Sequence, residues 1–210
     1  DPVTASCFNG IFLVATNPVD IMTRITCDLS GFNPRRVLGT GTTLDTARLR
    51  YLLGGYLNAD PRNVHAYVIG EHGDSEFVPW SQAMLATKPI LSLCGETGGR
   101  NICREELDQI AEEVRSAAYR IIEAKNATYY GIGMALTRIT KAILGDEHSV
   151  LTVSAMLRGD FGQRDVFVGV PCIINQNGIQ KVLPLSLTEE EMKKLEDSCN
   201  TLRTSFEGIF

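Results

Sequence analysis

The 210-residue sequence lacks several features that define whole classes of protein. No apolar run approaches the length that spans a bilayer, so a membrane-spanning helix is not expected. The opening residues, DPVTASCFNG, lack the basic and apolar regions of a signal peptide. No basic run is present and the formal net charge is −5, which argues against nucleic acid and anionic membranes as partners.

Cysteine pairs with the C-x-x-C spacing of metal and redox motifs are also absent. The six cysteines are scattered along the chain as Cys7, Cys27, Cys94, Cys103, Cys172 and Cys199. Scattered cysteines in a chain of this length are typical of reduced thiols in the cytoplasm and of small buried side chains. We therefore expect a cytoplasmic protein without a metal site.

The sequence does contain an alternation of strands and helices in its first third. Apolar runs and turn residues predict strands at 10–16, 35–41 and 63–70, with helices at 18–31 and 42–58 between them. This alternation is typical of an α/β domain with a parallel sheet. The sheet is small, and no G-x-G-x-x-G loop follows a strand, so the usual cradle for a dinucleotide is missing.

The rest of the sequence predicts an α+β region. Residues 77–104 show no clear period and are expected to be irregular with some helix. The elements predicted after them are helices at 104–131, 131–145 and 187–206 and antiparallel strands at 148–157 and 165–179. Thr188 and Glu191 have the spacing of a capping box at the start of the last helix. The predicted fold class is therefore α/β followed by α+β.

The stretch VIGEHGDSE places His72 in a polar turn just after a predicted strand. Histidine is the side chain best able to pass a proton near neutral pH, and loops on a rigid scaffold often carry catalytic groups. A carboxylate such as Asp45 is suited to hold one ring nitrogen while the other exchanges a proton. A structural histidine satisfied within its own turn explains the same pattern.

Two further segments carry candidate binding groups. In LDTARLR, Asp45 and Arg48 are three residues apart and share one helix face, and the planar guanidinium of Arg48 suits a carboxylate. From this segment alone, a weak surface ion pair is the favoured interpretation. Asn17 ends the first strand at the carboxyl edge of the sheet, where ligands of open α/β sheets bind, although Asn-Pro is also a turn signal.

Four motifs occur in order along the chain: TNPVDIMT, LDTARLRYLLG, VHAYVIGEHGDSE and NATYYGIG. With these motifs the sequence resembles the bacterial NAD-dependent L-lactate dehydrogenases from about residue 8 to its end. The resemblance implies that residues 1–41 are the remnant of a Rossmann-like dinucleotide-binding domain. Residues 42–210 would be the catalytic and substrate-binding domain of lactate/malate dehydrogenases, with the helix at 131–145 docked on the cofactor side.

The resemblance also implies roles for the candidate residues. His72 would be the acid/base that exchanges a proton with the oxygen of lactate or pyruvate, while hydride passes between C2 and the nicotinamide. Asp45 would orient His72 and stabilise its charged form, and Arg48 would bind the substrate carboxylate with two hydrogen bonds.

The same resemblance assigns contacts to the substrate and to NAD. Asn17 would contact both the substrate oxygen and the nicotinamide side, and Thr128 would line the substrate pocket. Ile132 would pack on the nicotinamide ring. Thr40 stands where the family usually has a serine that bonds the carboxamide, and its hydroxyl retains that capacity.

A regulatory site is implied as well. In lactate dehydrogenases activated by fructose-1,6-bisphosphate, an arginine and a histidine at the positions of Arg50 and His65 bind the phosphates at a subunit interface, and the family is usually tetrameric. The alternative is an exposed arginine and a strand histidine with no ligand. His148 is left without a role, as a loop histidine before a strand is more often structural.

Parts of the family pattern are absent from this sequence. They are the pyrophosphate loop, the acidic residue that binds the adenosine ribose, and the mobile loop with a second arginine and the residue that separates pyruvate from oxaloacetate. A malate or other 2-hydroxy acid dehydrogenase therefore remains an alternative to a glycolytic lactate dehydrogenase. A truncated piece that is inactive alone and binds NADH poorly is a second alternative.

Overall fold

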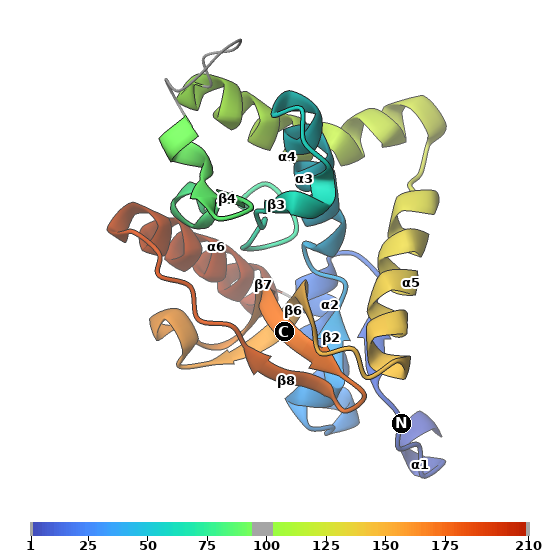
Figure 1. Ribbon diagram of the computed structural model, residues 1–210. Helices are drawn as coiled ribbons and strands as arrows, with labels where there is room; N and C mark the ends of the chain where they lie inside the picture. Colours follow the sequence, from blue (N-terminus) through green and yellow to red (C-terminus); the bar gives the residue numbers. More distant parts are fainter. Residues whose placement is uncertain (1, 94–102, 209–210) are drawn as a thin grey trace.

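The computed structural model describes residues 2–93 and 103–208 of the protein (Figure 1). The helices are α1 (Pro2–Ala5), α2 (Val19–Ser30), α3 (Thr43–Tyr56), α4 (Arg104–Lys125), α5 (Tyr130–Leu144) and α6 (Glu189–Glu207). The strands are β1 (Phe12–Val14), β2 (Val37–Gly39), β3 (Val64–His65), β4 (Met84–Leu85), β5 (Lys88–Pro89), β6 (Ser149–Arg158), β7 (Arg164–Asn175) and β8 (Gly178–Val182). This order confirms the predicted α/β region followed by an α+β region.

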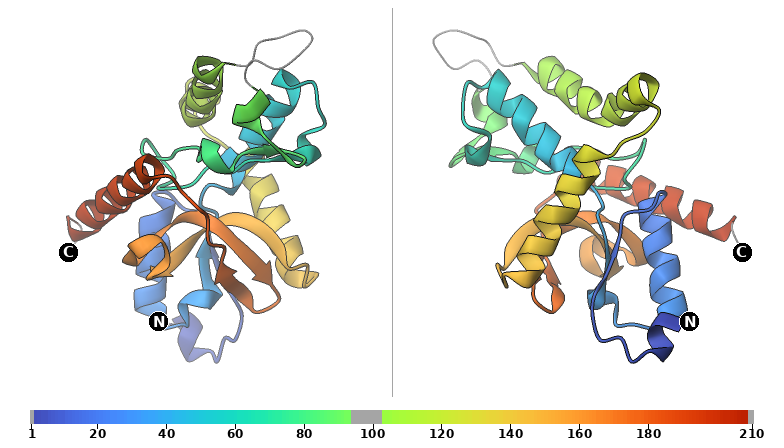
Figure 2. Two further views of the ribbon diagram at one scale, coloured as in Figure 1. Left: turned by 60° about the vertical axis from the view of Figure 1, so that its left-hand side comes forward. Right: turned by 90° about the vertical axis from the view of Figure 1, so that its right-hand side faces the viewer.

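A five-stranded mixed sheet in the order β1-β2-β6-β7-β8 forms the centre of the molecule. β1 and β2 are parallel, whereas β6, β7 and β8 are antiparallel neighbours. Gly39 of β2 pairs with Ser154 of β6, so the sheet includes strands from both sides of residue 41. Figure 2 shows α5 along one side of this sheet and α2 and α6 along the other.

The largest hydrophobic core lies between the sheet and these helices. Its fully buried members include Leu38, Ile69, Ile139, Leu157, Val168, Ile174 and Leu195. A second core lies under α3 and α4 and includes Leu49, Leu53, Val64, Trp80, Ile90 and Leu107. Burial of these side chains supplies the main driving force for folding and positions the loops between the two cores.

The prediction of a third parallel strand at 63–70 is wrong. Only Val64–His65 form a strand, β3, and it belongs to a separate antiparallel sheet in the order β3-β4-β5. Beyond it, Ile69 bridges Phe77 and Gly70 bridges Gly169. Val64, Ala66 and Val68 are buried and give the sequence its alternating apolar pattern. That pattern does not specify which sheet a strand joins.

The segment expected to be irregular contains short elements that the sequence did not indicate. β4 and β5 are strands of two residues each, and 3-10 turns occur at Trp80–Gln82 and Ile90–Leu93. Strands this short carry no readable period. The part of the segment at 94–102, with Cys94, lies outside the described residues.

Helix ends follow local chemistry. Pro18 is the N-cap of α2, and Gly31 ends that helix with φ of 64°. α4 ends at Lys125, before the expected residue 131, because Asn126 adopts a left-handed conformation. The capping box of Thr188 and Glu191 is confirmed at the start of α6. In the described part of the chain, no helix has the length and apolar character needed to cross a bilayer.

Candidate active site

Threonine hydroxyls tie the start of α3 to the segment after β3 and to β6. Thr42 Oγ1 donates a hydrogen bond to the Val68 carbonyl at 2.7 Å, and Thr43 Oγ1 donates to the Thr152 carbonyl at 2.8 Å. Thr46 Oγ1 accepts from the Val68 amide at 2.9 Å. These bonds orient the first turn of α3, which carries the buried carboxylate of Asp45.

The turn after residue 69 is held from two other helices. Gly70 has φ of 104°, a conformation that glycine adopts without steric cost. The Glu71 amide donates to Ser198 Oγ of α6 at 2.7 Å, and the His72 amide donates to Asp20 Oδ2 of α2 at 2.9 Å. α2 and α6 thus fix the backbone that presents the His72 ring.

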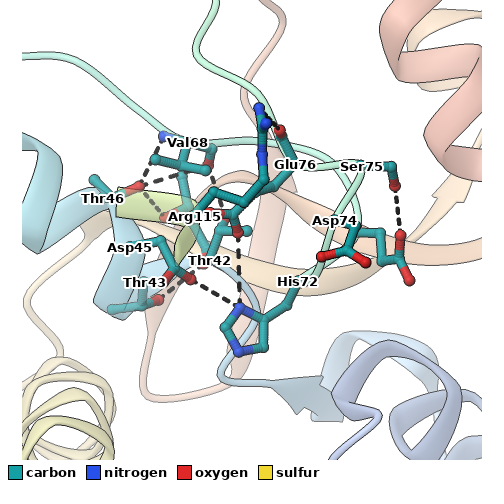
Figure 3. A network of polar contacts seen from close by, with 12 residues as sticks. Thr42, Thr43, Asp45, Thr46, Val68, His72, Asp74, Ser75, Glu76 and Arg115 are labelled. Carbon is teal, nitrogen blue, oxygen red and sulfur yellow. Dashed lines mark hydrogen bonds and ion pairs between the residues drawn. The ribbon is translucent and has the colours of Figure 1, made fainter. Parts of the chain in front are cut away.

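Figure 3 shows the His72 ring directed at two carboxylates. Nδ1 of His72 lies 2.8 Å from Oδ2 of Asp45 and 3.8 Å from Oε2 of Glu76. The other ring nitrogen points away from both carboxylates. The Asp45 and Glu76 side chains are 4% and 5% exposed, whereas that of His72 is 24% exposed. One ring nitrogen is therefore held inside the protein and the other faces outward.

These contacts raise the pKa of His72 from 6.5 to about 10. Burial opposes the charged ring, but the hydrogen bonds and charges of Asp45 and Glu76 outweigh it. Burial also raises the pKa of Glu76 to about 7, although the His72 ring and Arg115 act in the opposite direction. The two carboxylates thus favour the charged form of the ring.

Arg48 completes the cluster on the same helix face as Asp45. Its Nη1 donates to Asp45 Oδ1 at 3.2 Å, and its side chain is 20% exposed. A Cβ added to Gly131 at the start of α5 would lie 3.7 Å from Nη2 of Arg48. Thr128, just before α5, and Ile132, in its first turn, flank Gly131, and both are half-buried.

Asn17 and Thr40 follow the carboxyl ends of the two parallel strands. Asn17 is exposed and follows β1, and the Asn17–Pro18 peptide bond is cis. Three residues later, Asp20 contacts the His72 amide. Thr40 follows β2, is 3% exposed, and donates its amide to the Val14 carbonyl at 2.8 Å. Both therefore stand at the carboxyl edge of the parallel pair, where ligands of such sheets bind.

The remaining candidates lie elsewhere. Arg50 turns away from Arg48: its Nε donates to the Ala66 carbonyl at 2.9 Å, and its guanidinium covers the Tyr67 ring at 4.8 Å. His65 is exposed on β3, next to Ala66. His148 is exposed, and its ring lies 3.1 Å from the Gln180 side chain.

Potential metal ligands gather at one place in the described residues, where atoms of Asp45, His72 and Glu76 lie within 4.8 Å of one another. The short ion pair of His72 and Asp45 already occupies two of these atoms. The described cysteines are free thiols, and those of Cys27, Cys172 and Cys199 are buried. Burial raises the pKa of the Cys199 thiol to about 12.

Two family models match this chain. Residues 42–210 match the lactate/malate dehydrogenase alpha/beta C-terminal domain, and residues 1–39 match the lactate/malate dehydrogenase NAD-binding domain. The chain belongs to the lactate/malate dehydrogenase family. This confirms the resemblance carried by the four sequence motifs.

Individual relatives within the lactate/malate dehydrogenase family are close in sequence. L-lactate dehydrogenase 2 of Bacillus cereus is 54% identical over 97% of this chain and 64% of its own length. L-lactate dehydrogenase of Oceanobacillus iheyensis is 52% identical over 98% of this chain and 63% of its own. The chain thus spans less than two thirds of these relatives.

A solved structure of a lactate/malate dehydrogenase family member superimposes on nearly the whole chain. The minor L-lactate dehydrogenase of Enterococcus mundtii, in its ligands-bound form, matches with a TM-score of 0.94 and 46% identity, over 99% of this chain and 66% of that one. The L-lactate dehydrogenase of Clostridium thermocellum matches with a TM-score of 0.89 and 37% identity, over 99% of this chain and 69% of that one.

The candidate site of the present chain includes residues that the sequence analysis did not single out. Asp20, Glu76, Arg115 and Ser198 approach His72 or its turn from four segments of the chain. Asp20 is 2% exposed, and burial raises its pKa to about 6. Its only sequence signal is an acidic residue in the first turn of a helix, which is common on solvated surfaces.

Proposed function

We propose that the protein acts in an NAD-dependent L-lactate dehydrogenase that interconverts lactate and pyruvate. The observation that carries the proposal is the arrangement of three side chains. Nδ1 of His72 is held 2.8 Å from Asp45, and Arg48 lies on the other oxygen of the same carboxylate. A proton donor beside a guanidinium suits a substrate with a carbonyl next to a carboxylate.

In this reaction each side chain has a distinct task. Arg48 binds the substrate carboxylate, which places the neighbouring carbonyl oxygen at the outward nitrogen of His72. His72 donates its Nε2 proton to that oxygen during reduction and accepts it back during oxidation. Asp45 forms an ion pair with the other ring nitrogen and stabilises the charged ring. Asn17 and Thr128 would contact the substrate from the strand end and the start of α5.

The residues present fit one side of a nicotinamide cofactor. The carboxyl edge of a parallel strand pair, with Asn17 and Thr40 at its ends, is a common cofactor position. Ile132 offers an apolar surface at the start of α5. When bound, NAD(H) supplies or receives the hydride. Asn17, Thr40 and Ile132 would position the nicotinamide beside His72.

The test uses a chimera, because the chain spans 64% of its Bacillus cereus relative. The 210 residues replace the matching region of that relative, and NADH oxidation by pyruvate is followed by absorbance for the chimera and for the chain alone. We expect the chimera to turn over pyruvate and its His72→Asn variant to lose on the order of 10²- to 10⁴-fold in kcat/KM. Activity that survives in the variant would overturn the role of His72.

Substrate choice within the family is tested in the same way. In the chimera the residue that separates pyruvate from oxaloacetate comes from the relative, so only a preference for oxaloacetate over pyruvate, at equal NADH, reports on the present residues. The relatives described above carry the name L-lactate dehydrogenase, so we expect pyruvate to be preferred by the chimera. Because the chimera borrows part of its sequence, a preference for oxaloacetate would assign malate specificity to the present residues.

Activation by fructose-1,6-bisphosphate is part of the proposal. A hollow of about 310 Å³ is lined by side chains that include Arg50, Arg62, Tyr67 and Arg138. Three arginines line this hollow, and arginine suits a polyanion, while Arg62 and Arg138 also pair with Asp60 and Glu147. His65 is not among the residues that line this hollow and lies on β3. We expect Arg50→Gln to abolish activation of a homotetrameric enzyme, and the Arg120→Gln control on the exposed face of α4 to retain it.

A further inference from the structure

A second buried carboxylate lies beside the proton-transferring histidine. Oε2 of Glu76 is 3.8 Å from Nδ1 of His72, and its side chain is 5% exposed. Asp45 already forms an ion pair with Nδ1 at 2.8 Å, so the proposed mechanism needs no second carboxylate there. A buried carboxylate carries a desolvation cost unless it has a partner. The arrangement therefore calls for a function of its own.

The backbone of Glu76 is fixed on both sides. Its amide donates to the Gly73 carbonyl at 3.3 Å, and the next amide, of Phe77, donates to Ile69 at 2.9 Å. Its carbonyl accepts a hydrogen bond from Nη2 of Arg115 on α4 at 3.2 Å. Figure 3 shows the Glu76 side chain directed from this anchored backbone toward the His72 ring. The approach is thus set by the turn and by α4.

Charged groups reach the surroundings of His72 from several elements. They are Asp20 of α2, Asp45 and Arg48 of α3, Arg115 of α4, and Glu71 and Glu76 of the turn itself. Among these, the two carboxylates of Asp45 and Glu76 form ion pairs with the ring. Arg48 forms an ion pair with Asp45. Glu76 forms an ion pair with His72, and no arginine among the described residues forms one with Glu76.

We propose that Glu76 is a positioning residue that, together with Asp45, holds His72 in its charged, proton-donating form. Two carboxylates on one side of the ring stabilise the imidazolium more than one does, and they keep Nε2 directed outward. The consequence for catalysis rests on the proposed dehydrogenase function, whereas the effect on the ring does not. The Glu76 carboxylate would keep the ring protonated to higher pH than Asp45 alone.

The experiment is an NMR titration of the histidine rings in the 210-residue chain. The chain has three histidines, and a His72→Asn variant assigns the His72 signal. Wild type is compared with Glu76→Gln, which removes the charge at nearly constant volume. The matched control is Asp74→Asn, which removes a carboxylate from the same turn at an exposed position. Circular dichroism checks the fold of each variant.

We expect Glu76→Gln to lower the titration midpoint of His72 by about one to three pH units, since that is the usual effect of a close opposite charge. Asp74→Asn should shift it far less. Glu76→Asp, which keeps the charge but withdraws it by one methylene, should give an intermediate midpoint. An unchanged midpoint in folded Glu76→Gln overturns the proposal, as does a shift of the same size in Asp74→Asn. If Glu76→Gln does not fold, an unchanged midpoint in Glu76→Asp overturns it.

The titration separates this proposal from the dehydrogenase function because it needs neither cofactor nor substrate. A shifted midpoint in a chain whose chimera fails to reduce pyruvate supports the role of Glu76 while rejecting the activity. If both hold, the upper pH limit of pyruvate reduction in the chimera should fall with the midpoint in Glu76→Gln. A loss of activity without a change in that limit would indicate a merely structural residue.

Discussion

Nδ1 of His72 lies 2.8 Å from Oδ2 of Asp45, although the ring belongs to a turn and the carboxylate belongs to the first turn of α3. This distance depends on hydrogen bonds between separate segments. The Thr43 hydroxyl of α3 donates to the Thr152 carbonyl of β6, and the Asp20 carboxylate of α2 accepts from the His72 amide. The pair is therefore a product of packing between α2, α3 and the sheet.

Removal of the Asp45 charge should shift the pH dependence of both stability and activity. The pKa of His72 is raised, so the stabilisation is complete below 6.5 and is lost as the pH rises toward about 10. Asp45→Asn should remove most of it and lower the upper pH limit of pyruvate reduction. Urea denaturation at about pH 6 and about pH 9 measures the first effect, and a stability gap between variant and wild type that stays constant with pH would contradict it.

Arg48→Lys should weaken substrate binding more than it slows the chemistry. An ammonium group does not reproduce the two parallel hydrogen bonds that a guanidinium makes with a carboxylate. We expect KM for pyruvate in the chimera to rise on the order of 10- to 100-fold. Arg104→Lys, in an exposed ion pair with Asp108, is the control and should leave KM unchanged. An equal KM for Arg48→Lys and wild type would exclude Arg48 as the carboxylate anchor.

Asp20→Asn should change stability with a pH dependence of the same sign as Asp45→Asn, but in a lower pH range. Burial raises the pKa of Asp20 from 3.8 to about 6, so the folded state loses stability as the pH rises through that window. Asparagine carries no charge at any pH and keeps one oxygen for the His72 amide. Relative to wild type, the variant should gain roughly 3 kcal/mol between about pH 4 and about pH 7. A relative stability that is the same at both values would show that Asp20 titrates normally.

Gly70→Ala should destabilise the turn that carries His72. Its φ of 104° disfavours a side chain, and an added Cβ would lie 2.9 Å from Ser198 Oγ. We expect a loss of about 1 to 3 kcal/mol in the free energy of unfolding. Gly55→Ala, in α3 with no atom within 4 Å of the added Cβ, should instead stabilise the chain by about 0.5 to 1 kcal/mol. Thermal unfolding of both variants tests the contrast, and equal effects would contradict it.

Several features could be predicted from the sequence because they depend on neighbours along the chain. The capping box of Thr188 and Glu191 needs only two residues at the right spacing, and the contact between Asp45 and Arg48 needs only one helical turn. The positions of α2, α3, α5 and α6 follow from apolar spacing and from turn residues at their ends. The family motifs then identified His72 as the candidate acid.

Tertiary structure decided the rest, because contacts between segments distant in sequence leave no periodic signal. The same alternation of Val64, Ala66 and Val68 fits a parallel strand or the edge of a separate antiparallel sheet, and packing under α3 selected the second. Asp20 and Glu76 look like ordinary surface acids in the sequence. In the fold, Asp20 of α2 accepts a hydrogen bond from the His72 amide, and Arg115 of α4 donates one to the Glu76 carbonyl. The sequence by itself determined which residue passes the proton in this proposal, whereas the fold alone decided which carboxylates surround it.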